Sequence, residues 1–138
     1  KYLPNSLNQK DRKKQLNSIL EMRDRPKVAS FKSKRSPYIV RFEKKYGFKI
    51  SDYNKIHKNI MKKQGIDKII NKGRGAYYSS GSRPNQTAES WARARLASVI
   101  LFGNAFRVDK NIALKYGSKK WLSTRPPKYI WNFFIIYI

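Results

Sequence analysis

Positive charge is the feature that most constrains how this chain can fold. Thirty-two Lys and Arg stand against eight Asp and Glu, which gives a net charge of +24 over 138 residues. The excess is not confined to one tail, since residues 1–50 hold fifteen cations and four acids and residues 51–138 hold seventeen and four. A compact monomer with this charge repels itself unless counter-ions or an acidic partner relieve it. We therefore expect a modest core with solvated or partner-bound arms.

The periodicity of apolar residues predicts a mainly α protein: a small helical domain with an extended basic N-terminal arm and an apolar, aromatic C-terminal tail. In the leader, residues 1–36, a first helix is expected over Gln9–Asp24, capped by Asn5 or Ser6 and ended by Arg25-Pro26. Its apolar side is a narrow stripe, formed by Leu16, Ile19 and Leu20.

The stretch from Arg25 to Ser36 has five cations, no acid and no helical period, and is expected to be an extended basic arm. Three interpretations stay open: a flexible linker, a strap laid over another protein or nucleic acid with Phe31 in a pocket, and a nuclear-localisation patch. In the second interpretation, the binding residues are Lys27, Phe31, Lys32, Lys34 and Arg35.

Residues 37–116 are expected to form the helical core domain. Helix starts are indicated at Ser36-Pro37, at Ser51-Asp52 and at Thr87, where small polar residues can cap the first turn. The helix after Thr87 is the most apolar, and we expect it to form the core through Trp91, Leu96, Val99, Ile100 and Phe102. The other expected helices run from Pro37 to Gly47, from Asp52 to Gly65, from Ile66 to Asn71 and from Val108 to Tyr116.

Residues 71–87 are rich in Gly, Ser, Pro and Asn and are expected to form a long ordered loop. Its start, Lys72-Gly73-Arg74-Gly75, is either a phosphate cradle or an ordinary glycine-rich turn. The candidate nucleic-acid or partner contacts here and in the next helix are Lys72, Arg74, Tyr77, Tyr78, Arg83, Arg93 and Arg95. Tyr77, Tyr78 and Trp121 are candidates for base stacking on single strands.

The basic and aromatic tail, residues 117–138, ends in YIWNFFIIYI, which has one polar residue in ten. Ten apolar residues are too few for a spanning helix, which needs about twenty. The tail is therefore expected to dock on a partner through Trp131, Phe133 and Phe134, with a strand in the chain's own core and membrane contact as the alternatives.

No catalytic or metal-binding pattern is recognisable. Cysteine is absent, His57 is the only histidine, and the eight acids are scattered along the chain. We expect no enzyme activity, no cofactor and no metal; a nuclease whose acidic ligands converge from distant positions is the remaining enzymatic alternative.

The stretch KGRGAYYSSGSRPNQT from Lys72 to Thr87, followed by Trp91 and Ala94-Arg95-Leu96, resembles an uncharacterised domain family of large DNA viruses of algae and protists and of some tailed phages. The resemblance covers roughly residues 2–114. At the position after Trp91 many members have glycine, whereas this chain has Ala92.

What the resemblance implies is a virion structural protein: a basic minor capsid or cement protein at the inner face of a giant-virus shell. Its partners would be the major capsid protein and other minor capsid proteins, with viral DNA nearby, and its location the capsid interior. The alternative is a DNA-binding viral protein that condenses or packages the genome without reading its sequence.

Overall fold

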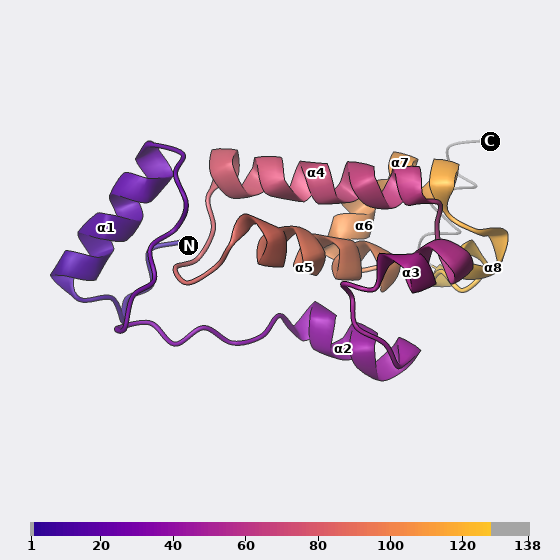
Figure 1. Ribbon diagram of the computed structural model, residues 1–138, viewed down its shortest axis with the longest axis horizontal. Helices are drawn as coiled ribbons and strands as arrows, with labels where there is room; N and C mark the ends of the chain where they lie inside the picture. Colours follow the sequence, from indigo (N-terminus) through magenta and orange to yellow (C-terminus); the bar gives the residue numbers. More distant parts are fainter. Residues whose placement is uncertain (1, 128–138) are drawn as a thin grey trace.

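The computed structural model describes residues 2–127, and these residues form short helices joined by turns and one extended segment (Figure 1). Within the described part there are eight helices and no strand, which confirms the prediction of a mainly α protein. None of these helices is long and apolar enough to cross a membrane. The helices are α1 (Gln9–Leu20), α2 (Pro37–Tyr46), α3 (Tyr53–Asn59), α4 (Lys63–Ser80), α5 (Ala88–Ile100), α6 (Asn104–Val108), α7 (Lys110–Tyr116) and α8 (Lys119–Leu122).

The core is built around α4 and α5, which form an antiparallel pair joined by the turn at residues 81–87 (Figure 1). Helices α2, α3, α6, α7 and α8 pack around this pair. One apolar cluster runs through them, and it includes Leu96, Val99, Ile100 and Phe102 from the predicted core helix. That helix begins where expected, because Thr87 and Ser90 form a reciprocal capping box. Trp91 is only partly buried, so the prediction for α5 holds except at its first turn.

The expected loop at residues 71–87 is wrong over most of its length, because α4 continues without a break to Ser80. Only residues 81–87 form a turn. Gly73, one of the glycines that suggested a loop, is required for close packing, because a Cβ there would lie 2.6 Å from the Cα of Ala92. Gly65, earlier in α4, is required for the same reason, since its Cβ would lie 2.5 Å from the Cβ of Tyr116. Tertiary packing therefore overrides the low helix propensity of glycine here.

The break between α3 and α4 lies before Gly65, not at it. Helix α3 ends at Asn59, and the next residues pair with the segment that follows α7. The Lys62 amide donates to the Tyr116 carbonyl at 2.9 Å, and the Ser118 amide donates to the Ile60 carbonyl at 2.7 Å. This pairing ties α3 and α4 to α8, whose Trp121 is buried in the core.

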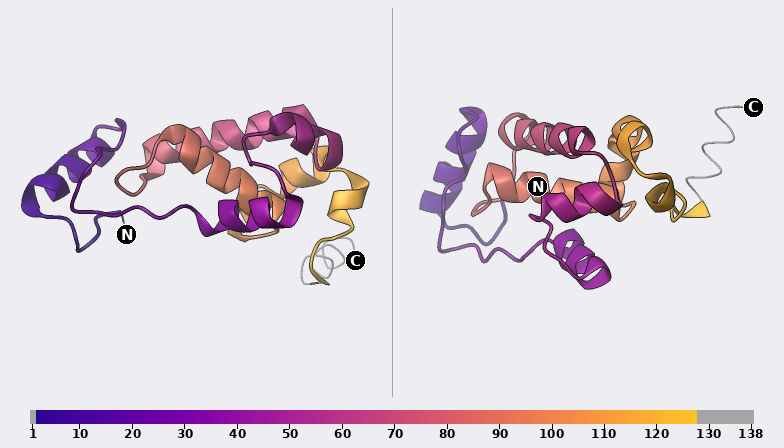
Figure 2. Two further views of the ribbon diagram at one scale, coloured as in Figure 1. Left: turned by 60° about the horizontal axis from the view of Figure 1, so that its bottom comes forward. Right: turned by 45° about the vertical axis from the view of Figure 1, so that its right-hand side comes forward.

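Helix α1 and the segment after it form a separate leader lobe at one end of α4 and α5, with α8 at the other end (Figures 1 and 2). The helix is capped by Asn8, not by Asn5 or Ser6, and it ends at Leu20 rather than at Asp24. The reason is a Schellman-type end, in which Met22 takes a left-handed conformation, with φ of 53°, and the Arg23 amide donates to the Ser18 carbonyl.

The expected apolar stripe of α1 does not face the protein. Leu16 and Leu20 are 40% and 70% exposed and Ile19 is partly buried, whereas the polar Gln15 and Ser18 are buried. Helix α1 is therefore attached through polar contacts more than through its apolar stripe. The aromatic end of the tail lies outside the described residues, and with it Trp131, Phe133 and Phe134.

Candidate anion-binding surface

The turn at residues 81–87 holds the basic arm against the core. Asn85, which has a φ of 66°, is the centre of this contact. Its side-chain oxygen accepts from the Val28 amide at 2.6 Å, and its side-chain nitrogen donates to the carbonyls of Val28 and Phe31 at 3.2 and 2.8 Å. The Asn85 amide also donates to the Pro26 carbonyl at 3.0 Å. Residues 26–31 are thus ordered by their own chain, which rules out a flexible linker for this part of the arm.

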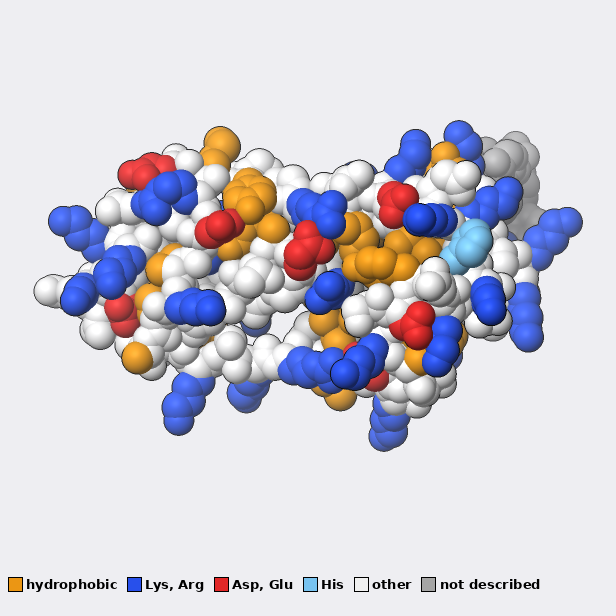
Figure 3. All heavy atoms as spheres, in the orientation of Figure 1, with side chains coloured by type: hydrophobic (Ala, Val, Ile, Leu, Met, Phe, Trp, Pro, Cys, Tyr) orange, Lys and Arg blue, Asp and Glu red, His pale blue; other side chains and the backbone are white. Residues whose placement is uncertain are grey.

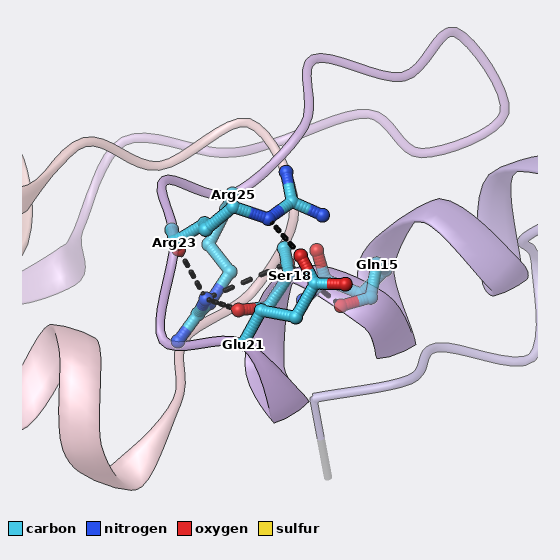
Figure 4. A network of polar contacts seen from close by, with 5 residues as sticks. All are labelled: Gln15, Ser18, Glu21, Arg23 and Arg25. Carbon is cyan, nitrogen blue, oxygen red and sulfur yellow. Dashed lines mark hydrogen bonds and ion pairs between the residues drawn. The ribbon is translucent and has the colours of Figure 1, made fainter.

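Arg25 is the second anchor, and its side chain is 5% exposed (Figure 4). One terminal nitrogen donates to the carbonyls of Ser18 and Arg23 at 2.9 and 2.6 Å, and the other donates to the Tyr77 carbonyl at 2.7 Å. Among the residues that the structure describes, no carboxylate accepts a hydrogen bond from this guanidinium, so backbone carbonyls at the end of α1 and in α4 stabilise the buried charge. Arg25 therefore caps α1 and joins it to α4.

Tyr77 is completely buried, and it connects α4 with Arg25 of the leader and with the 81–87 turn. Its hydroxyl accepts from the Arg25 amide at 2.7 Å and donates to the Gln86 carbonyl at 2.8 Å. Burial raises the pKa of Tyr77. Its neighbour Tyr78 is 36% exposed, and its hydroxyl donates to Asp24 at 2.7 Å, which raises the pKa of Tyr78.

The expectation that three aromatic side chains stack on bases is wrong for two of them. Tyr77 is enclosed, and Trp121, which is 3% exposed, stacks on Phe102 and donates its indole N–H to the Ile100 carbonyl at 2.9 Å. Only Tyr78 keeps an accessible ring face. Tyr77 was assigned to a loop in the sequence, whereas it lies on the buried side of α4.

Lys72, Arg74 and Arg95 do not form a phosphate cradle but bind carboxylates of the chain. Arg95 makes a two-bond pair with Asp109, at 2.8 Å for each bond, and the Lys72 ammonium lies 2.8 Å from the same carboxylate. Burial raises the pKa of Asp109, but the hydrogen bonds from Arg95 and Lys72 outweigh it and hold that pKa below its ordinary value. The buried Asp109 thus fixes α7 to both α4 and α5.

Arg74 pairs with Glu89 at 2.5 Å on the surface between α4 and α5. Its hydrogen bond lowers the pKa of the Glu89 carboxyl. Lys72, Arg74 and Arg95 were expected to bind an external partner, and the distant acids that pair with all three could not be located from the sequence.

The remaining candidates do face outward. Lys27, Lys32, Lys34, Arg35 and Arg83 are exposed, and Phe31 is partly buried. Figure 3 shows how Lys and Arg side chains project around the outline of the molecule, with the acids set among them. The structure therefore separates the predicted binding residues into a group paired with distant acids of the chain and a group exposed at the surface, in which Arg35 is paired with Glu43.

The basic arm forms one wall of a cavity of about 410 Å³, and the other walls are α2, residues 49–51 and the first turns of α5. This face of the molecule is hollowed near its middle in Figure 3. Four cations line the cavity: Lys34, Arg35, Lys49 and Arg93. Sequence reasoning singled out three of them but missed Lys49, because nothing in the sequence indicated that residues 33–36, 49–51 and 85–93 meet.

Comparisons with known proteins identify the family of the chain. Neither the curated proteins nor the solved structures include a significant match to the chain. A family described as "Family of unknown function (DUF5824)" matches residues 6–116, which span the leader lobe, the Asn85 turn and the helical core through α7. That region contains every contact by which Arg25, Tyr77 and Asn85 join the two lobes. The chain therefore belongs to the DUF5824 family, a family of unknown function.

Proposed function

We propose that this protein is a virion structural protein: a minor capsid or cement protein that binds the acidic inner face of the shell of a large double-stranded DNA virus. The observation that carries the proposal is the distribution of charge after folding. Eight acids cannot neutralise 32 cations, and two of those acids, Glu89 and Asp109, already pair with cations of the chain. The outward-facing cations need a negatively charged surface from another molecule.

The leader lobe supports an assembly role rather than a soluble, free-standing one. It stands at one end of the molecule and exposes Leu16, Leu20 and Met22 beside its cations. An elongated molecule with an apolar and cationic projection suits a protein that bridges neighbouring subunits. The viral setting is supported by the resemblance of the Lys72–Thr87 stretch to proteins of large DNA viruses and phages.

The test is to strip purified virions in rising salt and to follow this chain against the major capsid protein and the genome. Release with shell fragments is the expected result, because the cationic surface would stay on the acidic shell until the salt screens it. Release together with the genome, or loss on nuclease treatment, would contradict a shell position.

Non-sequence-specific binding of the viral genome is the second candidate. It is favoured by the exposed cations of the arm and of the 81–87 turn, Lys27, Lys32, Lys34 and Arg83. Each phosphate contact should lower the logarithm of the binding constant by about 0.9 per tenfold rise in salt. A binding constant for duplex DNA that is independent of salt would eliminate this candidate.

A further inference from the structure

We propose that the cavity between the basic arm, α2 and the start of α5 is a binding site for a phosphate-type oxyanion. Its size of about 410 Å³ falls in the range of about 300–1,000 Å³ that is typical of small-molecule sites. Three separate segments supply its cations, so the site exists only in the folded chain. The site does not depend on the assembly role proposed above, and its test needs no virion.

The cations of the cavity exceed its acids by three. Lys34, Arg35, Lys49 and Arg93 line it together with one carboxylate, Glu43. Arg35 is the only one of the four that forms an ion pair within the described residues, and it lies 2.6 Å from Glu43. Cations that line a concave surface raise the local concentration of anions more than the same charges spread over a convex one.

Arg93 gives the most direct indication of a missing ligand. Its Nε is buried, and in the described part of the chain no atom accepts a hydrogen bond from it. A guanidinium carries five donors and no acceptor, and a buried donor without an acceptor costs about 1–3 kcal/mol. An oxyanion in the cavity would supply that acceptor, and the planar guanidinium fits phosphate geometry.

Neutral donors complete the lining. Ser36 stands at the N-terminus of α2 but makes no capping hydrogen bond with its side chain, which leaves that hydroxyl available. Thr87 and Ser90 also line the cavity, but their hydroxyls are already engaged in the capping box of α5. The site therefore combines cations with a free hydroxyl, as phosphate sites commonly do.

Glu43 has a defined role in this site, as the anion that holds Arg35 when no ligand is bound. The hydrogen bond from Arg35 lowers the pKa of the Glu43 carboxyl, so Glu43 is ionised at neutral pH. A bound oxyanion would compete with it for Arg35. Removing the charge of Glu43 should accordingly strengthen anion binding, whereas removing a cation should weaken it.

The experiment is a calorimetric titration of the full chain with pyrophosphate at low salt. Arg93→Gln should weaken binding about tenfold, from the loss of one close charge, and Lys34→Gln should weaken it in the same direction. Lys14→Gln on the exposed side of α1 is the matched control, because it removes the same charge at a distance from the cavity and should leave the affinity unchanged. Glu43→Gln should tighten binding.

Two results would overturn the site. One is an equal loss of affinity in Lys14→Gln and Arg93→Gln, which would mean that pyrophosphate binds to diffuse surface charge. The other is unchanged or weaker binding in Glu43→Gln. Lys34 lies outside any helix, so Lys34→Gln and Glu43→Gln still decide the question if Arg93→Gln does not fold.

Competition experiments based on the same titration identify which kind of phosphate the site binds. A short oligothymidylate with a 5′-phosphate and the same oligomer without it are each tested as competitors of pyrophosphate. Competition by both oligomers identifies a backbone phosphate, competition by the phosphorylated one alone identifies a terminal phosphate, and competition by neither identifies a free inorganic anion. If the virion experiment fails while this titration succeeds, only the assembly role is lost.

Discussion

The helical core and the leader lobe are held in place by different kinds of contact. Every residue of the main apolar cluster lies between Ile39 and Trp121, in the helical core. The leader lobe contributes none of them: among its described apolar residues only Leu7 and Val28 are buried, and Tyr2 makes one ring contact with Trp91. Its hydrogen bonds to the core run through Gln15, Arg25 and the arm that Asn85 holds. Hydrophobic burial depends little on direction, whereas a hydrogen bond is lost when its partner moves by an ångström or two.

The comparison teaches that the leader is a docked element whose position rests on a few directional contacts. Gln15 illustrates this, because its amide nitrogen donates to the carbonyls of Tyr2 and Ser82 at 3.0 and 2.7 Å. Elements with few apolar contacts open at a lower free energy than the global unfolding transition. We therefore expect the leader lobe to detach while the core stays folded.

Arg25→Leu should have the largest effect and should act on the leader alone. The substitution leaves the carbonyls of Ser18 and Tyr77 without their donor, which costs about 3–5 kcal/mol for a broken buried charge network. Hydrogen exchange should show lost protection in α1 and retained protection in α4 and α5. Arg23→Leu, whose side chain is exposed, is the control and should change little. Equal loss of protection in both lobes would mean that they unfold as one unit.

Asp109→Asn should have the next largest effect and should act on the core. It leaves Arg95 and Lys72 without their shared carboxylate, at a cost of about 3 kcal/mol in thermal or chemical unfolding. Asp52→Asn, at an exposed ion pair, is the control. A loss confined to α1 would contradict the assignment of Asp109 to the core.

The ion pairs of Asp109 with Arg95 and Lys72 also predict how the stability of the core depends on pH. Because the pKa of Asp109 is lowered by folding, its contribution is fully present above the unfolded value of about 3.9 and is lost as the pH falls through the folded value. The unfolding free energy of the core should therefore fall on acidification below that point, and Asp109→Asn should flatten the profile. A profile identical in both proteins would exclude Asp109 as the cause.

Two glycines of α4 that lie two positions apart, Gly73 and Gly75, test how closely α4 approaches α5. Gly73→Ala should destabilise the protein by about 2 kcal/mol, because its methyl would overlap Ala92 of α5. Gly75→Ala should instead stabilise by about 1 kcal/mol, since no atom lies within 4 Å of its Cβ position and alanine favours the helix. The opposite signs are measured by thermal unfolding. Two stabilising substitutions would mean that α4 and α5 do not approach as closely as described.

Met22→Gly should have the smallest effect and should again act on the leader. Met22 has a φ of 53°, a conformation that glycine adopts without strain, and its side chain is 62% exposed. The gain should be about 1 kcal/mol, visible as slower exchange in α1 only. A destabilised α1 would show that the exposed methionine side chain makes a contact that supports the lobe.

The sequence was informative where a signal is local. The starts of α2, α3 and α5 were predicted from Ser36-Pro37, Asp52 and Thr87, and each helix begins there. Asp52 and Thr87 cap α3 and α5 through amides only three positions away, and α2 begins with Pro37 in its first turn, without a side-chain cap from Ser36. The sequence was misleading where the partner is distant. Gly73 suggested a loop because Ala92 was not known to face it, and the stripe of Leu16 and Leu20 suggested a buried face that the leader does not have.

By itself, the sequence determined the helical class, the caps of α3 and α5 and the excess of positive charge, because composition and spacing within one turn do not depend on the rest of the fold. The tertiary structure alone decided which cations stay available. Lys72, Arg74 and Arg95 meet acids between 14 and 37 residues away, while Lys34, Lys49 and Arg93 converge on an open cavity. Two charges that are equivalent in the sequence become a structural ion pair or a binding site according to what the chain brings within about 4 Å of them.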